Sequence, residues 1–454
     1  MKLKLLFFTL ILVFSGVSLS AKQLQLLKIS ENKKYLVTED GKPFFWLGDT
    51  AWELIHKLNE DETKNYLDDR EEKGFTIIQT VILAEQDGLR KPNANGDLPL
   101  FDLDPTKPNE KYFKHVDFVL KQAEKRNLYV GLLPTWGDKW NLKWGVGPEI
   151  FTPENAEIYG QYLGERYKNQ KNIIWVLGGD RPPENDTHKE IIRAMAKGIK
   201  SADKNHLLTY HISGYSIATN YFNDDWLDVD MFQAKHGKDS EPYNFVWKAK
   251  EVKPQRPVII GEPRYENIPN NFKPEEGWIN DADIRKSAYW SYLAGAAGFT
   301  YGCNDVWQMY SINDHPVIFA RTGWEAALQL PGAQQMKYVQ QLFTALPWHQ
   351  LQNNQSVILN ENKPGQQFMM AATSEKKDFM LVYTPVGEKV KVDLTDLKPK
   401  KLKAYWYNPR SGKYKFAGDY SNSEKPELAP WATGEGSDFI LIVTGENSDY
   451  QPEI

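Results

Sequence analysis

Two acidic residues, Asp180 and Glu262, each stand directly after a short apolar run that ends in glycine. Residues 173–180 read IIWVLGGD, and residues 257–262 read PVIIGE. An acid that follows a buried strand is costly unless it is solvated, paired or functional. Two facing carboxyl groups can divide acid–base and nucleophilic work between them. One protonates a leaving oxygen and the other attacks carbon or activates water, which is what hydrolysis of a glycosidic bond requires.

The elements that must position these acids are eight apolar runs, at residues 44–49, 76–83, 129–134, 173–180, 207–211, 229–233, 257–262 and 298–302. Continuous apolarity is typical of parallel strands that are buried on both faces. Amphipathic stretches lie between the runs, at residues 63–73, 112–126, 155–167, 189–201 and 284–297. The alternation predicts an α/β fold, a (β/α)₈ TIM barrel. A doubly wound open sheet is the competing fold, but no glycine-rich phosphate loop follows the first run.

Functional residues of such a barrel lie at the carboxyl ends of its strands. Strands four and seven lie on opposite sides of the mouth, so we expect Asp180 and Glu262 to face each other. Gly178, Gly179 and Gly261 would let a substrate approach the backbone. Polar and aromatic residues near the other strand ends are predicted to bind substrate. They are Asp49, Trp52, Trp136, His211, Gln233, His236, Arg264 and Trp307.

Each of these residues also has a purely structural interpretation. Asp180 could cap a helix or pair with Arg181, both common for an aspartate after a strand. Glu262 could be a buried acid paired with Arg264 or His211. Asp49 could cap the first helix. Arg264 and Lys235 could recognise the carboxylate of an acidic sugar, although surface pairing is the default for both.

Composition narrows the class of ligand. The chain has 454 residues, a net charge of −5, and 15 Trp, 23 Tyr and 21 Phe. Aromatic rings stack well on the C–H faces of sugars, whereas no basic patch suggests nucleic acid. The single cysteine, Cys303, cannot form an intramolecular disulfide, and no Cys/His cluster has zinc-site spacing. We therefore expect an oligo- or polysaccharide partner, with no metal and no cofactor, and a monomer.

Residues 1–21 have the pattern of a signal peptide. Lys2 and Lys4 precede an apolar stretch at residues 5–14, and small residues at 18–21 suit cleavage. The stretch is too short for a membrane span, and polar residues follow it. The sequence predicts an exported protein, periplasmic or secreted, with no membrane span after signal removal.

The pattern changes after about residue 345. Strand-like runs separated by turn signals lie at 368–372, 379–384, 389–392, 402–407 and 439–443. They predict a small antiparallel β-sandwich. We place a catalytic barrel at 22–348, including an N-terminal strand or hairpin at 22–43, and an accessory domain at 349–454.

Three motifs carry a resemblance to a known family. Residues 42–52 (KPFFWLGDTAW), the GGDRP run at 178–182 and the GEP run at 261–263 resemble motifs of the apiosidase-like family, glycoside hydrolase family 140. The likeness spans the barrel, and the tail resembles the small β domain that often follows it. The resemblance implies Asp180 as acid/base, Glu262 as nucleophile, and removal of apiose-linked units from the pectin rhamnogalacturonan II.

One feature departs from the wider clan of such barrels, most of which carry Asn-Glu at the end of strand four. Here Gly179-Asp180 stands there, and aspartate is one methylene shorter. Either the backbone comes closer, as Gly179 permits, or the acid protonates the leaving group from a different direction. A retaining double displacement then requires carboxyl groups roughly 5–5.5 Å apart, against about 6.5–9.5 Å for inversion. The alternatives are a non-catalytic carbohydrate-binding protein, or a clan-related glucanase- or mannanase-like glycosidase.

Overall fold

A computed structural model of the chain describes residues 24–214, 216–448 and 450. The predicted signal peptide at 1–21 lies outside the described residues. Among the described helices, none combines the length and apolarity needed to cross a membrane.

Eight parallel strands form the barrel: β4 (Trp46–Thr50), β5 (Ile77–Leu83), β6 (Tyr129–Thr135), β7 (Ile173–Leu177), β8 (Leu208–Tyr210), β9 (Asp230–Gln233), β10 (Val258–Glu262) and β11 (Gly298–Tyr301). Hydrogen bonding runs in the order β8-β7-β6-β5-β4-β11-β10-β9. A parallel bridge between Thr209 and Val229 joins the two ends of this order and nearly closes the barrel. The (β/α)₈ prediction is confirmed, and all eight strands overlap the predicted runs.

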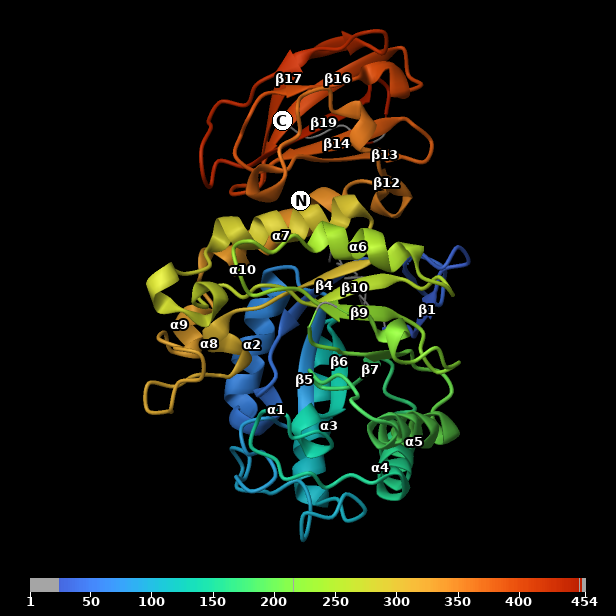
Figure 1. Ribbon diagram of the computed structural model, residues 1–454, viewed down its shortest axis with the longest axis vertical. Coiled ribbons are helices and arrows are strands. Elements are labelled where there is room, and N and C mark those ends of the chain that lie inside the picture. Colours follow the sequence, from blue (N-terminus) through green and yellow to red (C-terminus); the bar gives the residue numbers. More distant parts are fainter. Residues whose placement is uncertain (1–23, 215, 449, 451–454) are drawn as a thin grey trace, which may run out of the picture.

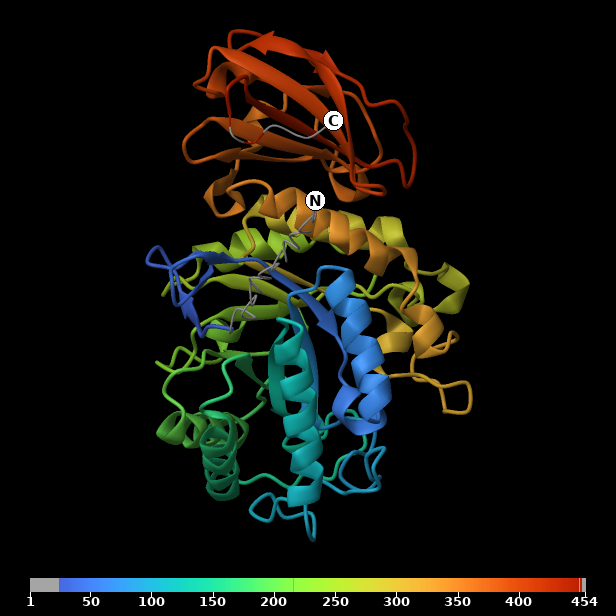
Figure 2. The same cartoon turned by 180° about the vertical axis from the view of Figure 1, so that it is seen from behind.

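Helices cover the outside of the barrel (Figures 1 and 2). They are α1 (Leu54–Lys57), α2 (Glu60–Glu72), α3 (Glu110–Lys125), α4 (Pro153–Tyr167), α5 (Asp186–Ala202), α6 (Pro242–Glu251), α7 (Asp281–Ala294), α8 (Asn304–Trp307), α9 (Trp324–Ala327) and α10 (Pro331–Thr344). Helix α5 shows why these segments fold. The Asn185 side chain caps its amino end, and Ile192, Met195 and Ile199 form one buried stripe.

The C-terminal region forms a six-stranded antiparallel sheet in the order β12 (Leu351–Asn353), β13 (Met370–Ser374), β14 (Phe379–Thr384), β19 (Phe439–Gly445), β16 (Lys401–Asn408) and β17 (Lys413–Ser421). The pair β15 (Val390–Lys391) and β18 (Glu427–Leu428) covers one face. Side chains of β14 alternate between two cores: Met380 and Val382 face the small pair, and Leu381 and Tyr383 face the barrel side. The β-sandwich prediction is confirmed.

Helix α7 lies between the barrel and this sheet, next to α10 (Figure 1). All of its residues from Asp283 to Ala294 are buried, because it packs against both neighbours. Arg285 donates to both carboxylate oxygens of Asp438, at 2.7–3.1 Å, and Tyr289 stacks on Tyr383 with ring centroids 5.2 Å apart. The C-terminal sheet therefore holds one of the barrel's own helices in place.

The N-terminal segment forms a small antiparallel sheet of β1 (Leu27–Ile29), β2 (Leu36–Thr38) and β3 (Pro43–Phe44). Between β1 and β2, Lys34 forms an ion pair with Glu375 of the C-terminal region at 3.0 Å. The predicted hairpin is present and contacts the tail.

Candidate active site

Asp180 is presented by an unusual backbone turn at the end of β7. Gly178, Gly179 and Asp180 have φ angles of +96°, +65° and +60°. This left-handed region costs glycine little, and aspartate tolerates it better than most residues. A Cβ on Gly179 would lie 2.6 Å from the backbone nitrogen of Gly137, at the end of β6. The turn therefore sits tightly against the neighbouring strand end, as expected if the backbone compensates for the short aspartate.

This packing makes Gly179→Ala a strongly destabilising change. Alanine would adopt a strained φ and also meet backbone atoms of residues 135–137, so we expect the free energy of unfolding to fall by about 3 kcal/mol. Gly41→Ala is the matched control, because Gly41 has φ +81° but nothing within 4 Å of an added Cβ. Urea unfolding measures both variants. The control should lose about 1 kcal/mol in free energy of unfolding, because it has the backbone strain without the steric clash. Equal losses in the two variants would contradict this account of the turn.

Glu262 is the last residue of β10 and lies between two histidines. The His236 Nε2 stands 3.1 Å from its Oε1, and the His211 Nε2 stands 3.0 Å from its Oε2. The second approach is not aligned as a hydrogen bond. The backbone N–H of Asp180 donates to Nδ1 of His211 at 3.2 Å, so a neutral His211 carries its proton on Nε2, toward Glu262. His211 therefore lies between the backbone of Asp180 and the carboxyl group of Glu262.

The two carboxyl groups lie close together. One oxygen of Asp180, one of Glu262 and a ring nitrogen of His211 lie within 4.8 Å of one another. Burial, followed by the charge of Glu262, raises the pKa of Asp180 to about 8. Burial also favours a raised pKa for Glu262, but His211 and His236 outweigh it and hold that pKa well below its usual range. At neutral pH the pair contains one acid and one base.

The same three side chains are spaced closely enough to coordinate a divalent cation. Carboxylate ligands must be ionised to bind a metal. With the pKa of Asp180 at about 8, this carboxyl holds its proton at neutral pH. A cation would therefore have to displace this proton in order to bind there.

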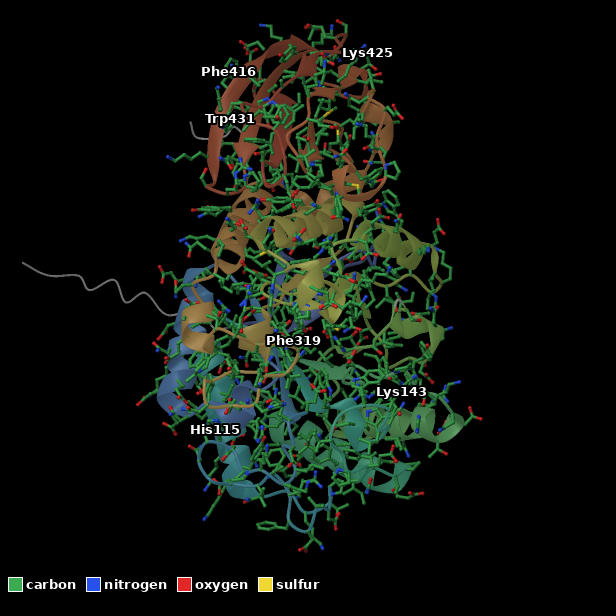
Figure 3. All side chains as sticks on the ribbon, turned by 60° about the vertical axis from the view of Figure 1, so that its left-hand side comes forward. His115, Lys143, Phe319, Phe416, Lys425 and Trp431 are labelled. Carbon is green, nitrogen blue, oxygen red and sulfur yellow. The ribbon has the colours of Figure 1, made fainter. Side chains whose placement is uncertain are left out.

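A cavity of about 680 Å³ opens over the two acids. Of the residues predicted to bind substrate, Trp52, Trp136, Gln233, His236 and Trp307 line it. His211 lies beneath the lining, against Glu262 and the ring of Trp52. Trp144, in the loop after β6, and Ile318, in the loop after α8, also line the cavity, and their neighbours Lys143 and Phe319 are labelled in Figure 3.

Asp49 does not reach the cavity, and its predicted role in substrate binding is wrong. Its carboxylate is fully buried and accepts hydrogen bonds from Nε of Arg70, at 2.6 Å, and from the hydroxyl of Tyr66. Both partners belong to α2. The side chain therefore points from β4 toward the helical layer, where it fastens α2 to the barrel.

Arg264 is likewise misassigned. Its guanidinium is fully buried and donates to Oγ of Ser287 and to the carbonyl oxygens of Lys238 and Ser240, at 2.7–3.0 Å. These bonds tie the loop after β9 to α7, which positions His236 indirectly. Lys235 does line the cavity, where it pairs with Asp239 at 3.0 Å.

Two further polar residues of the cavity, Tyr265 and Glu85, had no predicted role in substrate binding. The hydroxyl of Tyr265 accepts a hydrogen bond from Nε1 of Trp52 at 3.2 Å, and its ring lies against His236. Glu85, two residues beyond β5, places a third carboxyl group in the cavity. Its position after a strand places it among the polar strand-end residues of the sequence, although no role was predicted for it.

A (β/α)₈ barrel with an acid and a base facing one cavity at strands β7 and β10 has the arrangement of a glycoside hydrolase. Two similar solved structures are described as such. A "Glycoside hydrolase" is 32% identical, with a TM-score of 0.85, covering 94% of this chain and 98% of that one. A glycoside hydrolase family 5 protein from Bacteroides vulgatus is also 32% identical, with a TM-score of 0.86 and 94% of each chain covered. The chain is a glycosidase.

The family follows from the sequence of the barrel. A family model described as "Apiosidase-like, catalytic domain" matches residues 30–350, so the chain belongs to the apiosidase-like family. A second model, described as "Putative collagen-binding domain of a collagenase", matches residues 353–444. No curated protein sequence matches the chain.

Proposed function

We propose that this glycosidase works by a retaining double displacement, with Glu262 as nucleophile and Asp180 as acid/base. The observation that carries the proposal is the pair of carboxyl oxygens within 4.8 Å of each other, with pKa values displaced in opposite directions. So close an approach of one oxygen from each group favours the separation of roughly 5–5.5 Å between carboxyl groups of a retaining enzyme over the about 6.5–9.5 Å of an inverting one.

In the first step the Glu262 carboxylate attacks the anomeric carbon while Asp180 gives its proton to the leaving oxygen. The resulting glycosyl ester carries no charge on Glu262. Because that charge contributes to the raised pKa of Asp180, ester formation lowers the pKa and leaves Asp180 ready to act as a base. Asp180 then takes a proton from water, whose oxygen attacks the anomeric carbon and releases Glu262.

We propose apiose linkages of rhamnogalacturonan II as the substrate and export of the protein as its location. The family membership supports the sugar, and the signal-like segment at 1–21 supports export. The proposed units are the barrel at 22–348 and the accessory domain at 349–454. The contact of Arg285 with Asp438 favours a bracing role for the accessory domain. We propose that the protein acts as a monomer.

The substrate is tested by incubating the wild type with rhamnogalacturonan II fragments and with a panel of synthetic glycosides. Release of apiose-linked products, with the panel's other sugars untouched, is expected. Preferred hydrolysis of a different glycoside would reject apiose while leaving the hydrolase chemistry intact. The similar family 5 structure makes a clan-related glycosidase with another sugar specificity the second candidate.

The pH profile of kcat/KM should follow the two acids. Asp180 must be protonated in the free enzyme, so activity should fall as pH rises through about 8. Glu262 must be ionised, and its lowered pKa places the acidic limb below the usual glutamate range. Initial rates between pH 3 and 10 on one glycoside measure both limbs. A decline that begins near the usual pKa of aspartate would contradict the assignment of Asp180.

A further inference from the structure

Glu85 is a third carboxyl group in the cavity, and the mechanism does not use it. It lies two residues beyond β5 and lines the cavity together with Trp136 and Trp144. Within residues 24–214, 216–448 and 450, no hydrogen bond or ion pair reaches its side-chain oxygens. A carboxyl group in a mostly buried setting normally has partners. Glu85 is half-buried and is not among the residues whose buried side-chain atoms lack a partner, so its oxygens are free to bind a group that enters the cavity.

Neighbouring buried acids differ from Glu85 because each serves the fold. Glu53 accepts from the backbone of Gln86 at 3.0 Å and contacts Nδ1 of His56 at 2.7 Å. Asp138 pairs with Nζ of Lys139 at 2.7 Å and also accepts backbone N–H groups in the next loop. Such satisfied acids hold loops in place. Glu85 has no comparable task.

Glu85 is also separate from the reacting pair. The cluster whose atoms lie within 4.8 Å of one another consists of Asp180, His211 and Glu262, without Glu85. Only two carboxyl groups are needed at the scissile bond. A third one in the same cavity, whose charge adds to burial in raising the pKa of Asp180, is free to contact the sugar.

We propose that Glu85 is a specificity-determining residue that accepts hydrogen bonds from hydroxyl groups of a neutral sugar. The inference rests on the proposed function, because it assigns the same cavity to the substrate. When it is ionised, above its pKa of about 7, the carboxylate of Glu85 is an acceptor with two oxygens and can receive two adjacent hydroxyls. The rings of Trp136 and Trp144 supply apolar surface in the same cavity.

The charge of the site favours a neutral sugar over a uronic acid beside Glu85. Burial, and then the charges of Asp138 and Glu53, raise the pKa of Glu85 to about 7 against the opposing charges of Arg181 and Lys139, so the surroundings on balance oppose a negative charge there. A sugar carboxylate at the same place would add a second one. Lys235, the lysine of the cavity lining, is paired with Asp239.

The test measures sugar binding without turnover, in the Glu262→Gln background, by quenching of tryptophan fluorescence. The probes are D-apiose, L-rhamnose, L-arabinose and D-galactose, with D-galacturonate as the charged match of D-galactose. At least one neutral sugar should bind, and adding Glu85→Ala should weaken it by about 10–100-fold, the value of a hydrogen bond to a charged group. Glu85→Gln should narrow the preference for D-galactose over D-galacturonate. Glu165→Gln, on the exposed side of α4, is the matched control. It should change neither the affinity for the neutral sugars nor the preference for D-galactose over D-galacturonate.

Three results would overturn the inference: neutral-sugar affinities within twofold of the parent in Glu85→Ala, no binding of any neutral sugar, or tighter binding of D-galacturonate than of every neutral sugar. A second experiment, on enzyme kinetics, distinguishes a role of Glu85 in sugar binding from a role as proton donor. Glu85→Gln in the otherwise wild-type enzyme should raise KM with kcat within about threefold, whereas loss of kcat restored by azide would identify Glu85 as the acid. If the wild type hydrolyses no glycoside but binding depends on Glu85, the proposed function fails and the inference stands.

Discussion

Replacing Glu262 with glutamine is expected to lower kcat by about 10⁴-fold or more on every glycoside that the wild type hydrolyses, as for other covalent nucleophiles. The amide cannot form the glycosyl ester, and its shape preserves the contacts around it. Steady-state rates on the best substrate of the panel measure the loss. Binding of the same substrate should change little, so kcat and not KM should carry the effect.

Two further variants test whether the loss is specific to the nucleophile. Glu275→Gln is the same chemical change on the exposed segment at residues 274–276 and should retain full activity. Glu262→Ala should recover activity when azide is added, with a glycosyl azide of inverted configuration as the product, because the small anion replaces the missing nucleophile. Activity of Glu262→Gln above about 1% of wild type would remove Glu262 from this role.

Asp180→Asn is expected to lower kcat/KM by about 10²–10⁴-fold on natural linkages, the usual contribution of a general acid. A dinitrophenyl leaving group needs no proton, so glycosylation of the enzyme by such a substrate should be nearly normal. Deglycosylation should then become rate-limiting, with a burst of dinitrophenol. The alkaline limb of the pH profile near 8 should also disappear.

The contrast between leaving groups supplies the internal control for Asp180. A uniform loss on good and poor leaving groups would mean that the substitution damages the site and not the proton transfer. Absence of the dinitrophenol burst would likewise mean that Asp180→Asn damages the site and not only the proton transfer. Normal hydrolysis of natural linkages would transfer the acid role elsewhere, with Glu85 as the next carboxyl group in the cavity.

The barrel could be predicted from sequence because its strands are buried on both faces and are continuously apolar. The same property explains the error at Asp49. All five residues of β4 are buried, so apolarity does not indicate which side chains point into the barrel and which point toward the helices. Arg264 was misassigned for a related reason, because its partners on α7 and in the loop after β9 are distant in sequence.

The C-terminal region contains a strand that local sequence patterns did not predict. Strand β17 was not predicted, because it lies at the edge of the sheet, with Lys413 and Lys415 on it and Gly418 at a bulge. Its surface includes Phe416, which is exposed like the nearby Trp431 (Figure 3). Of the site, Asp180 and Glu262 could be chosen because each ends an apolar run. The partnerless state of Glu85 depends on its spatial neighbours and has no sequence signature.

The most direct measurement of the central claim is to trap the covalent intermediate. A 2-deoxy-2-fluoro glycoside of the preferred sugar, with a dinitrophenyl leaving group, slows both steps but slows release of the sugar most. Intact-mass analysis should then show one added glycosyl unit, and peptide mapping should locate it on Glu262. Attachment to any other residue, or no adduct together with an inverted first product, would contradict a double displacement between Glu262 and Asp180.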